Sequence, residues 1–126
     1  MLGLSANLNY YLFNGNVDLR KGIFRLCESI REEMSLDPSD ASNVYMFMSR
    51  NRKVVKILHY ERGFYVLYEK RPVMGKFKKP VFDEVSRCYR IQWSDMAYLT
   101  ESIVVDKMYV CLLYTSPSPR DMRRSR

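Results

Sequence analysis

Four short runs in the first part of the chain have the hydrophobic pattern of β-strands. Residues 7–13, 43–49, 54–60 and 64–70 are rich in aromatic and β-branched side chains, and turn residues bound them. The last three runs are joined by connections too short to cross a sheet, so neighbouring strands must be antiparallel. The pattern therefore predicts an antiparallel β-meander.

Residues 19–34, between the first and second runs, have the pattern of an amphipathic helix. Its apolar positions form one stripe, mostly three or four residues apart: Leu19, Ile23, Leu26, Cys27, Ile30 and Met34. Asp18 is placed to cap the N-terminus of this helix. We expect the stripe to pack on one face of the sheet, with Leu26 and Ile30 deeply buried.

The other face of the sheet is apolar as well. In the run at 54–60, Val55 and Ile57 point to one face, whereas Leu58 and Tyr60 point to the other. One face should take the helix. We expect the C-terminal part of the chain to cover the second face or to leave it open to a partner.

The pattern in the C-terminal part predicts three more elements, which complete the predicted fold class. Residues 74–80 form a basic loop, 89–92 a short strand, and 93–103 a helix that begins with Ser94 and Asp95 as its cap. The predicted class is α+β, as a single domain. It contains an antiparallel β-meander, a packed amphipathic helix and a shorter C-terminal helix.

The chain divides into a folded part, residues 1–110, and a basic tail, residues 111–126. From residue 115 onward the tail has one apolar side chain, two prolines and four arginines. It cannot bury enough apolar surface to offset the entropy of ordering, so it is expected to be disordered and dispensable. Its sequence resembles the translated read-through of a sequencing adapter, and we expect it to carry no function.

Positive charge is concentrated between residues 50 and 90. This window holds twelve Lys and Arg but four Asp and Glu, a net +8, whereas the whole chain carries +7. Seven aromatic side chains lie in the same window. Cations that displace phosphate counterions, interleaved with rings that stack on bases, are typical of a polyanion-binding surface. A solvated face of a basic sheet has the same composition.

The charged residues at both ends of the predicted helix have the sign that the helix dipole disfavours. Arg20 and Lys21 occupy its first turn and Glu32 and Glu33 its last part, and each placement costs about 0.3–1 kcal/mol. A phosphate at the N-terminus would meet free backbone N–H groups and two cations, which removes the conflict. The other interpretation is that Asp18 offsets the first turn and the remaining charges are solvated.

The sequence offers little for catalysis. His59, the single histidine, lies within a predicted strand, and the three cysteines form no C-x-x-C pair, so no zinc site is expected. No Gly-rich phosphate loop is present, and the aspartates are scattered over loops and caps. We expect a protein that is not an enzyme, with no metal and no cofactor. Its cysteine usage, short apolar runs and N-terminus favour a cytoplasmic protein.

Several linked segments resemble one known family. In chain order they are Gly15, 18–22 (DLRKG), 44–47 (VYMF), 50–52 (RNR), 56–60 (KILHY), 63–71 (GFYVLYEKR) and 75–77 (GKF) with Pro80. In order and spacing the chain is similar, over residues 9–103, to the TnpB-type (Orf-two-like) accessory protein of the insertion-sequence-sixty-six transposon family. Leu19 departs from the family pattern, which commonly has Met there.

The resemblance implies a non-catalytic accessory protein required for DNA transposition beside a separate transposase. It marks eight motif cations without giving them a role: Arg20, Lys21, Arg50, Arg52, Lys56, Lys70, Arg71 and Lys76. From their charge we predict contact with DNA, with the transposase of the same element, or with both. The turn after the first meander strand and the end of the third lie at the same end of a sheet. The cations at 50–52 and 70–76 are therefore expected to converge.

Two other functions fit the same composition, and a third is disfavoured by it. An aromatic, basic sheet can stack the bases of single-stranded RNA. A basic face can also meet an acidic transposase surface, as a protein–protein adaptor without direct duplex DNA contact. A small nuclease would need metal ligands that the sequence does not offer. Neither a membrane partner nor a particular oligomeric state is predicted.

Overall fold

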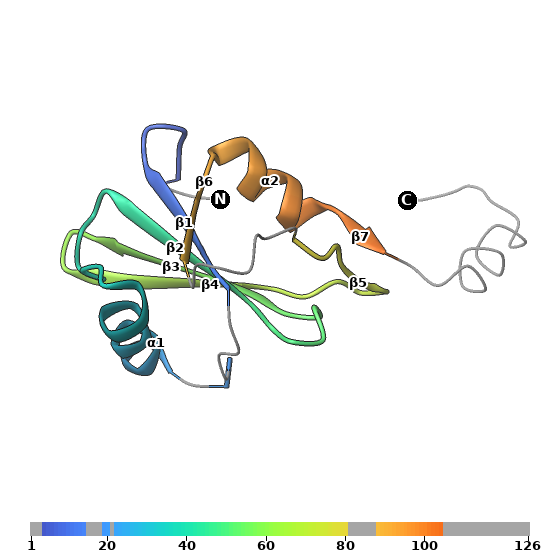
Figure 1. The fold of residues 1–126 in the computed structure, drawn as a ribbon, viewed down its shortest axis with the longest axis horizontal. Coiled ribbons are helices and arrows are strands. Elements are labelled where there is room, and N and C mark those ends of the chain that lie inside the picture. Colours follow the sequence, from blue (N-terminus) through green and yellow to red (C-terminus); the bar gives the residue numbers. More distant parts are fainter. Residues whose placement is uncertain (1–3, 15–18, 21, 81–87, 105–126) are drawn as a thin grey trace, which may run out of the picture.

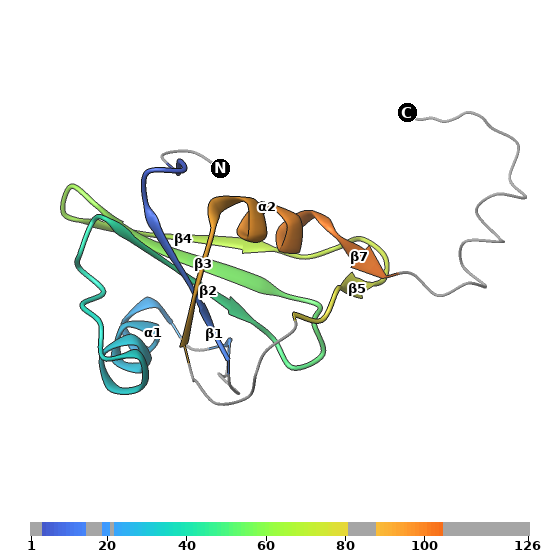
Figure 2. The same ribbon diagram turned by 45° about the horizontal axis from the view of Figure 1, so that its top comes forward.

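A five-stranded sheet forms the centre of the fold. The computed structural model describes residues 4–14, 19–20, 22–80 and 88–104. The strand order is β4-β3-β2-β1-β6. These strands are β1 (Asn9–Phe13), β2 (Asn43–Met48), β3 (Val55–Glu61), β4 (Phe64–Lys70) and β6 (Cys88–Ile91). One helix lies on each side of this sheet, so the described residues form three layers (Figures 1 and 2).

The predicted antiparallel meander is confirmed in strands β2, β3 and β4. Ile57 on β3 lies between Met46 of β2 and Tyr68 of β4, and both pairings are antiparallel. Strand β1 pairs parallel with β2 on the other side, with Tyr10 opposite Val44. A long connection that contains a helix is what two parallel neighbours require.

The first helix begins later than the sequence pattern predicts. Helix α1 (Ile23–Ser29) continues into a π-helical turn, η1 (Ile30–Met34), and its N-cap is Gly22. The expected cap, Asp18, lies outside the described residues, four positions before Gly22 in the sequence. The carbonyl of Leu19, before the helix, accepts a hydrogen bond from the Lys56 ammonium. In a helix that began at Leu19, that carbonyl would bond to the N–H of Ile23.

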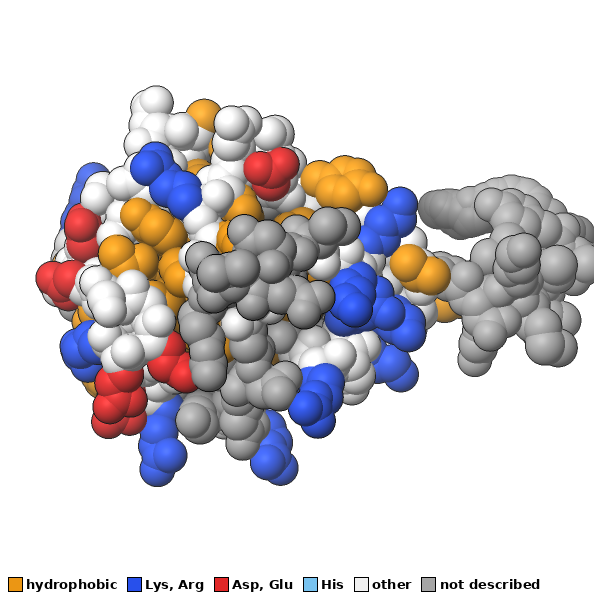
Figure 3. Space-filling model, viewed as in Figure 1, with side chains coloured by type: hydrophobic (Ala, Val, Ile, Leu, Met, Phe, Trp, Pro, Cys, Tyr) orange, Lys and Arg blue, Asp and Glu red, His pale blue; other side chains and the backbone are white. Residues whose placement is uncertain are grey.

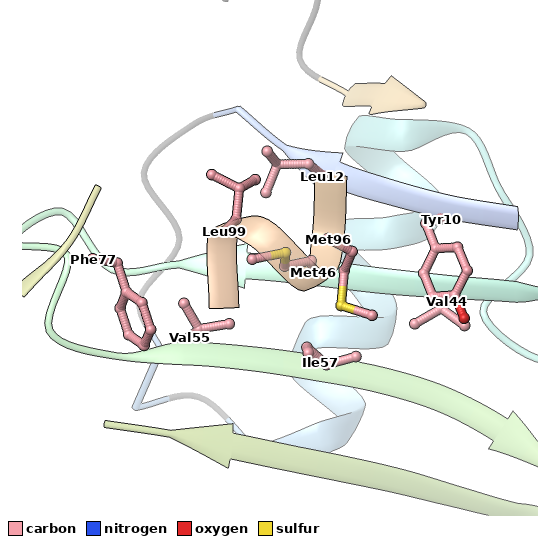
Figure 4. Packing of buried hydrophobic residues seen from close by; sticks show 9 residues of the cluster. All are labelled: Tyr10, Leu12, Val44, Met46, Val55, Ile57, Phe77, Met96 and Leu99. Carbon is pink, nitrogen blue, oxygen red and sulfur yellow. The ribbon is translucent and has the colours of Figure 1, made fainter. Parts of the chain in front are cut away.

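Each face of the sheet carries its own hydrophobic core. On one face α1 and η1 pack through Leu26 and Ile30, which have no exposed surface, as expected. The members of this cluster are Phe13, Leu19, Leu26, Cys27, Ile30, Met34, Tyr45, Phe47 and Leu58. On the opposite face lie Tyr10, Leu12, Val44, Met46, Val55, Ile57, Phe77, Met96 and Leu99 (Figure 4). The C-terminal part therefore covers the second face, which was one of the two expectations.

Helix α2 (Trp93–Glu101) supplies that cover, with Met96 and Leu99 directed at the sheet (Figure 4). Its N-cap is Gln92, which forms a capping box with Asp95, so the predicted cap at Ser94 and Asp95 is wrong by two or three positions. The Asp95 carboxylate accepts a hydrogen bond from the Gln92 backbone N–H at 3.0 Å. A capping box satisfies two otherwise unpaired donors of the first turn.

A small second sheet replaces part of the predicted basic loop. Strand β5 (Lys76–Phe77) pairs antiparallel with β7 (Ile103–Val104), and the two lie side by side at one end of the molecule (Figures 1 and 2). Phe77 is 1% exposed and joins the core beneath α2. The second helix therefore ends at Glu101, and Ile103 is a strand residue. The predicted tail, residues 111–126, lies outside the described residues.

Candidate nucleic-acid interface

Cationic side chains are unevenly distributed over the surface. On the face seen in Figure 3, a group of Lys and Arg side chains gathers toward the β5 end, whereas most acidic side chains gather toward α1. This end of the molecule also holds the turn between β2 and β3 and the end of β4. The backbone N–H of Phe77 donates to the Arg52 carbonyl at 2.8 Å, which ties β5 to that turn.

Three of the motif arginines line one open hollow at this end. Arg20 comes from the turn before α1, Arg50 from the turn after β2, and Arg71 from the residue after β4. The hollow has a volume of about 520 Å³. Its lining residues are Leu19, Arg20, Ser49, Arg50, Asn51, Val54 and Arg71. We call it the arginine hollow, and none of its described lining residues is acidic.

The turn that carries Arg50 is held by its own side chains. The Ser49 hydroxyl accepts hydrogen bonds from the backbone N–H groups of Lys53 and Val54, at 3.1 and 3.0 Å, and donates to the Asn51 side chain at 2.8 Å. The Arg52 N–H closes the turn by donating to the Ser49 carbonyl at 2.9 Å. Side chains that bond to nearby backbone fix a turn in this way. The guanidinium of Arg50 therefore extends from an ordered backbone.

An acidic side chain next to the hollow connects two cations. The Glu69 carboxylate accepts a hydrogen bond from Arg71 Nε at 2.6 Å and lies 3.6 Å from Lys56 Nζ. The hydrogen bond from Arg71 is the main cause that holds the pKa of Glu69 below its ordinary value, and the charges of Arg71 and Lys56 add to it. Glu69 thus stays ionised near neutral pH and limits where the Arg71 side chain points.

Lys56 is a buried residue and does not belong to the accessible basic face. It is 9% exposed, on the strand face that carries Leu58, and its ammonium donates to the Leu19 carbonyl. Burial of a charged group is costly unless it is paired and hydrogen-bonded. Glu69 and the Leu19 carbonyl supply that pairing. The predicted binding role of Lys56 stays a prediction, and in the free protein its ammonium already has these two partners.

Three other motif cations that the structure describes lie apart from the hollow. Lys70 hydrogen-bonds to Glu101 at 3.0 Å, so it points toward the α2 side. Lys76 is exposed on β5. Arg52 is half-buried, and its guanidinium donates to the Phe77 carbonyl at 3.3 Å. Lys21 lies outside the described residues. The expected convergence is thus found for Arg50 and Arg71, while alternation along β4 sends Lys70 to the opposite face.

The predicted phosphate site at the helix N-terminus does not match this geometry. Arg20 precedes Gly22, the N-cap, so it is not in the first turn of α1. Glu32 and Glu33 lie in the π-helical turn η1 instead of the last turn of an α-helix. The apparent conflict at the N-terminal end therefore rested on a helix that was predicted to begin too early, whereas Glu32 and Glu33 still lie near the C-terminal end of the continuous α1–η1 helix. Arg20 faces Arg50 and Arg71 around the hollow instead.

Sequence reasoning missed two kinds of residue in this region. Ser49 and Asn51 line the hollow as uncharged hydrogen-bonding groups, and nothing in their residue type marked them. Glu69 could have been found, because residues two apart on a strand share a face and Arg71 follows it by two. The same alternation places Lys56 beside Leu58 on the buried side. The charge count alone could not separate an inner lysine from an outer one.

The arrangement is suited to holding an oxyanion. A guanidinium is planar, permanently charged and presents paired donors that match phosphate oxygens. His59 does not contribute, because it is buried and its Nε2 lies 2.9 Å from the Ala41 carbonyl. In the part of the chain that the structure describes, no group of three His, Cys, Asp or Glu side chains could hold a metal ion. No helix within that part is long and apolar enough to cross a membrane.

Comparison with known proteins gives one match. Residues 8–109 match the family model described as IS66 Orf2 like protein, which covers the sheet, both helices and all eight motif cations. Neither the curated proteins nor the solved structures contain a match. Because the family model spans most of the chain, it also confirms the resemblance found in the sequence segments. The chain belongs to the IS66 Orf2-like family, the transposition-associated accessory proteins of IS66 insertion sequences.

Proposed function

We propose that this chain is a non-catalytic accessory factor that binds DNA during IS66 transposition, through the basic end that contains the arginine hollow. One observation carries the proposal. Arg20, Arg50 and Arg71 come from three segments far apart in the sequence, yet they line a single open hollow that has no acidic side chain among its described lining residues.

Contact with the DNA backbone follows from the charge and the exposure of these side chains. Arg50 and Arg71 are exposed, so a phosphate reaches them without unfolding any element. The side chains of Lys76, Lys78 and Lys79 are exposed at the same end of the molecule, around β5. A cluster of cations of this size attracts a polyanion before contact. Contact then releases counterions from the DNA backbone. Recognition of this kind favours no particular base sequence.

The transposase of the same element is the proposed protein partner. An accessory factor that holds DNA by its backbone supplies no cleavage chemistry, so it must act beside the enzyme that cuts and joins the strands. The basic end then faces the DNA. The remaining surface, including the exposed Phe24 and Phe64, stays available to the protein partner.

Binding assays with the full chain test the proposal. Fluorescence anisotropy with a labelled duplex at several salt concentrations should show affinity that falls steeply as salt rises. An RNA duplex and a single-stranded DNA of the same sequence serve as competitors. A parallel pull-down with the transposase of the same element provides the decisive contrast. If Arg50→Ala with Arg71→Ala binds DNA normally but loses the transposase, the basic end is a protein interface and the proposal is wrong.

A further inference from the structure

We propose that the arginine hollow takes a phosphate monoester at an end of a DNA strand, in preference to the phosphodiesters of a continuous backbone. This inference rests on the proposed function and names the chemical group that the same site binds. Three observations carry it: the charge of the hollow, its concave shape, and the contacts that hold the segments of two of its arginines.

The charge of the hollow matches a dianion. The three arginines among its described lining residues carry +3, and behind them the charge of Glu69, bonded to Arg71, is balanced by that of Lys56, 3.6 Å away. A phosphate monoester carries about −1.5 to −2 near pH 7, because its second pKa is about 6. A phosphodiester inside a strand carries a single negative charge. The monoester therefore gains more from three clustered guanidinium groups than a diester does.

The shape of the hollow favours a group that projects from the end of a chain. The arginines line a concavity together with Ser49 and Asn51. A terminal phosphate presents three acceptor oxygens on one side, whereas a diester presents two and continues as sugar in both directions. Leu19 and Val54 add apolar surface to the lining. Apolar neighbours lower the local dielectric and strengthen each charged hydrogen bond.

Contacts that involve the buried Lys56 ammonium hold the segments that carry two of the three arginines. The Lys56 ammonium bonds to the carbonyl of Leu19, the residue before Arg20. It also lies 3.6 Å from Glu69, whose other oxygen bonds to Arg71 at 2.6 Å. One buried cation therefore links the segments that carry Arg20 and Arg71. Lys56 acts as a positioning residue in this site, since binding to a pre-organised site loses less entropy than binding to a flexible one.

Matched DNA ends provide the test. One duplex of fixed sequence is prepared with a 5′-phosphate, with a 3′-phosphate, or with hydroxyl groups at all ends, and each competes for the labelled hydroxyl-ended duplex. A phosphorylated end should compete about tenfold better, the effect of one or two charge-assisted hydrogen bonds. Arg50→Ala and Arg71→Ala should each remove this preference. Arg25→Ala, which removes an exposed cation on α1 outside the hollow and outside the basic end, is the matched control and should keep it.

Failure of this inference is distinct from failure of the proposed function. If all three duplexes compete equally, the hollow holds no terminal phosphate, while DNA binding itself stands. If no duplex binds at all, the proposed function fails, and a nucleoside 5′-monophosphate then tests the hollow alone by phosphorus NMR. Broadening of the phosphorus signal by the parent chain, and its loss in Arg50→Ala, would support the monoester site. Absence of broadening would overturn it as well.

Discussion

The ammonium of Lys56 on strand β3 donates a hydrogen bond to the backbone carbonyl of Leu19, a residue 37 positions earlier in the chain. This contact joins the middle of the sheet to the segment before α1. Arg20, the next residue, lies in a turn before the helix and lines the hollow. A buried cation is thus bonded to the residue next to an exposed one.

Replacing Lys56 with Met tests this relationship. The unbranched side chain fills a similar volume but leaves the Leu19 carbonyl without its donor and Glu69 without one of its two cations. We expect the free energy of unfolding to fall by about 1–3 kcal/mol, the cost of an unsatisfied buried group. Chemical denaturation measures it. Lys53→Met, on an exposed turn residue, should change stability by less than about 0.5 kcal/mol. An equal change in both variants would show that the buried contact contributes nothing.

Replacing Arg50 and replacing Arg52 should change the free energy of unfolding by different amounts, although the two residues share a turn and a charge. Arg52 adopts a positive φ of 60° and bonds through its guanidinium to the Phe77 carbonyl, whereas Arg50 is exposed. Arg52→Ala should therefore lower the free energy of unfolding by about 0.5–1.5 kcal/mol, the net value of one hydrogen bond. Thermal unfolding of each single variant measures the difference. Arg50→Ala should lie within about 0.5 kcal/mol of the parent, and a larger loss there would contradict the placement.

The meander was predictable from the sequence because local rules determine it. Two very short connections leave antiparallel pairing as the sole option for β2, β3 and β4, and alternation places Ile57 and Leu58 on opposite faces. The parallel pairing of β1 with β2 needed more than a local rule. The helix between them was visible in the sequence, but which edge of the meander β1 joins depends on tertiary packing.

The sequence predicted which cations form the site better than it predicted which of them are accessible. The sequence marked Arg20, Arg50 and Arg71 as motif cations, and the rule for strand ends brought the last two together. It could not separate them from Lys56 and Arg52, because burial of a charged side chain depends on partners that are distant in sequence. Leu19 and Phe77 are those partners, and both interact through backbone carbonyls that no residue type reveals.

The core beneath α1 should depend strongly on Leu26. This side chain has no exposed surface and packs among residues of the helix and the sheet. Leu26→Ala should lower the free energy of unfolding by about 2–5 kcal/mol, through lost burial and the cavity left behind. Denaturant titration gives the value, with Val73→Ala as the aliphatic control. Val73 is fully exposed at 104%, so its truncation should cost less than about 0.5 kcal/mol. A loss below about 1 kcal/mol at Leu26 would contradict the packed layer.

The preference for phosphorylated DNA ends should depend on pH. The charged groups around the hollow are Arg20, Arg50 and Arg71, with Glu69 and Lys56 behind them. The pKa of Glu69 is lowered by Arg71, so its contribution to stability is complete above its ordinary pKa and is lost only in more acidic solution. The ligand is the group that titrates near neutrality, with a second pKa of about 6. The affinity ratio of phosphorylated to hydroxyl ends should therefore rise from about pH 5 to about pH 7.5. A constant ratio would argue against a dianion in the hollow.

The salt dependence of duplex binding tests the central claim most directly. Each phosphate contact contributes about 0.9 to the slope of log affinity against log salt concentration. For a hydroxyl-ended duplex, Arg50→Ala combined with Arg71→Ala should reduce that slope by up to about 2 and weaken binding to all sequences alike. Unfolding transitions of this double variant should show that it remains folded. A slope equal to that of the parent chain would contradict DNA binding through the arginine hollow.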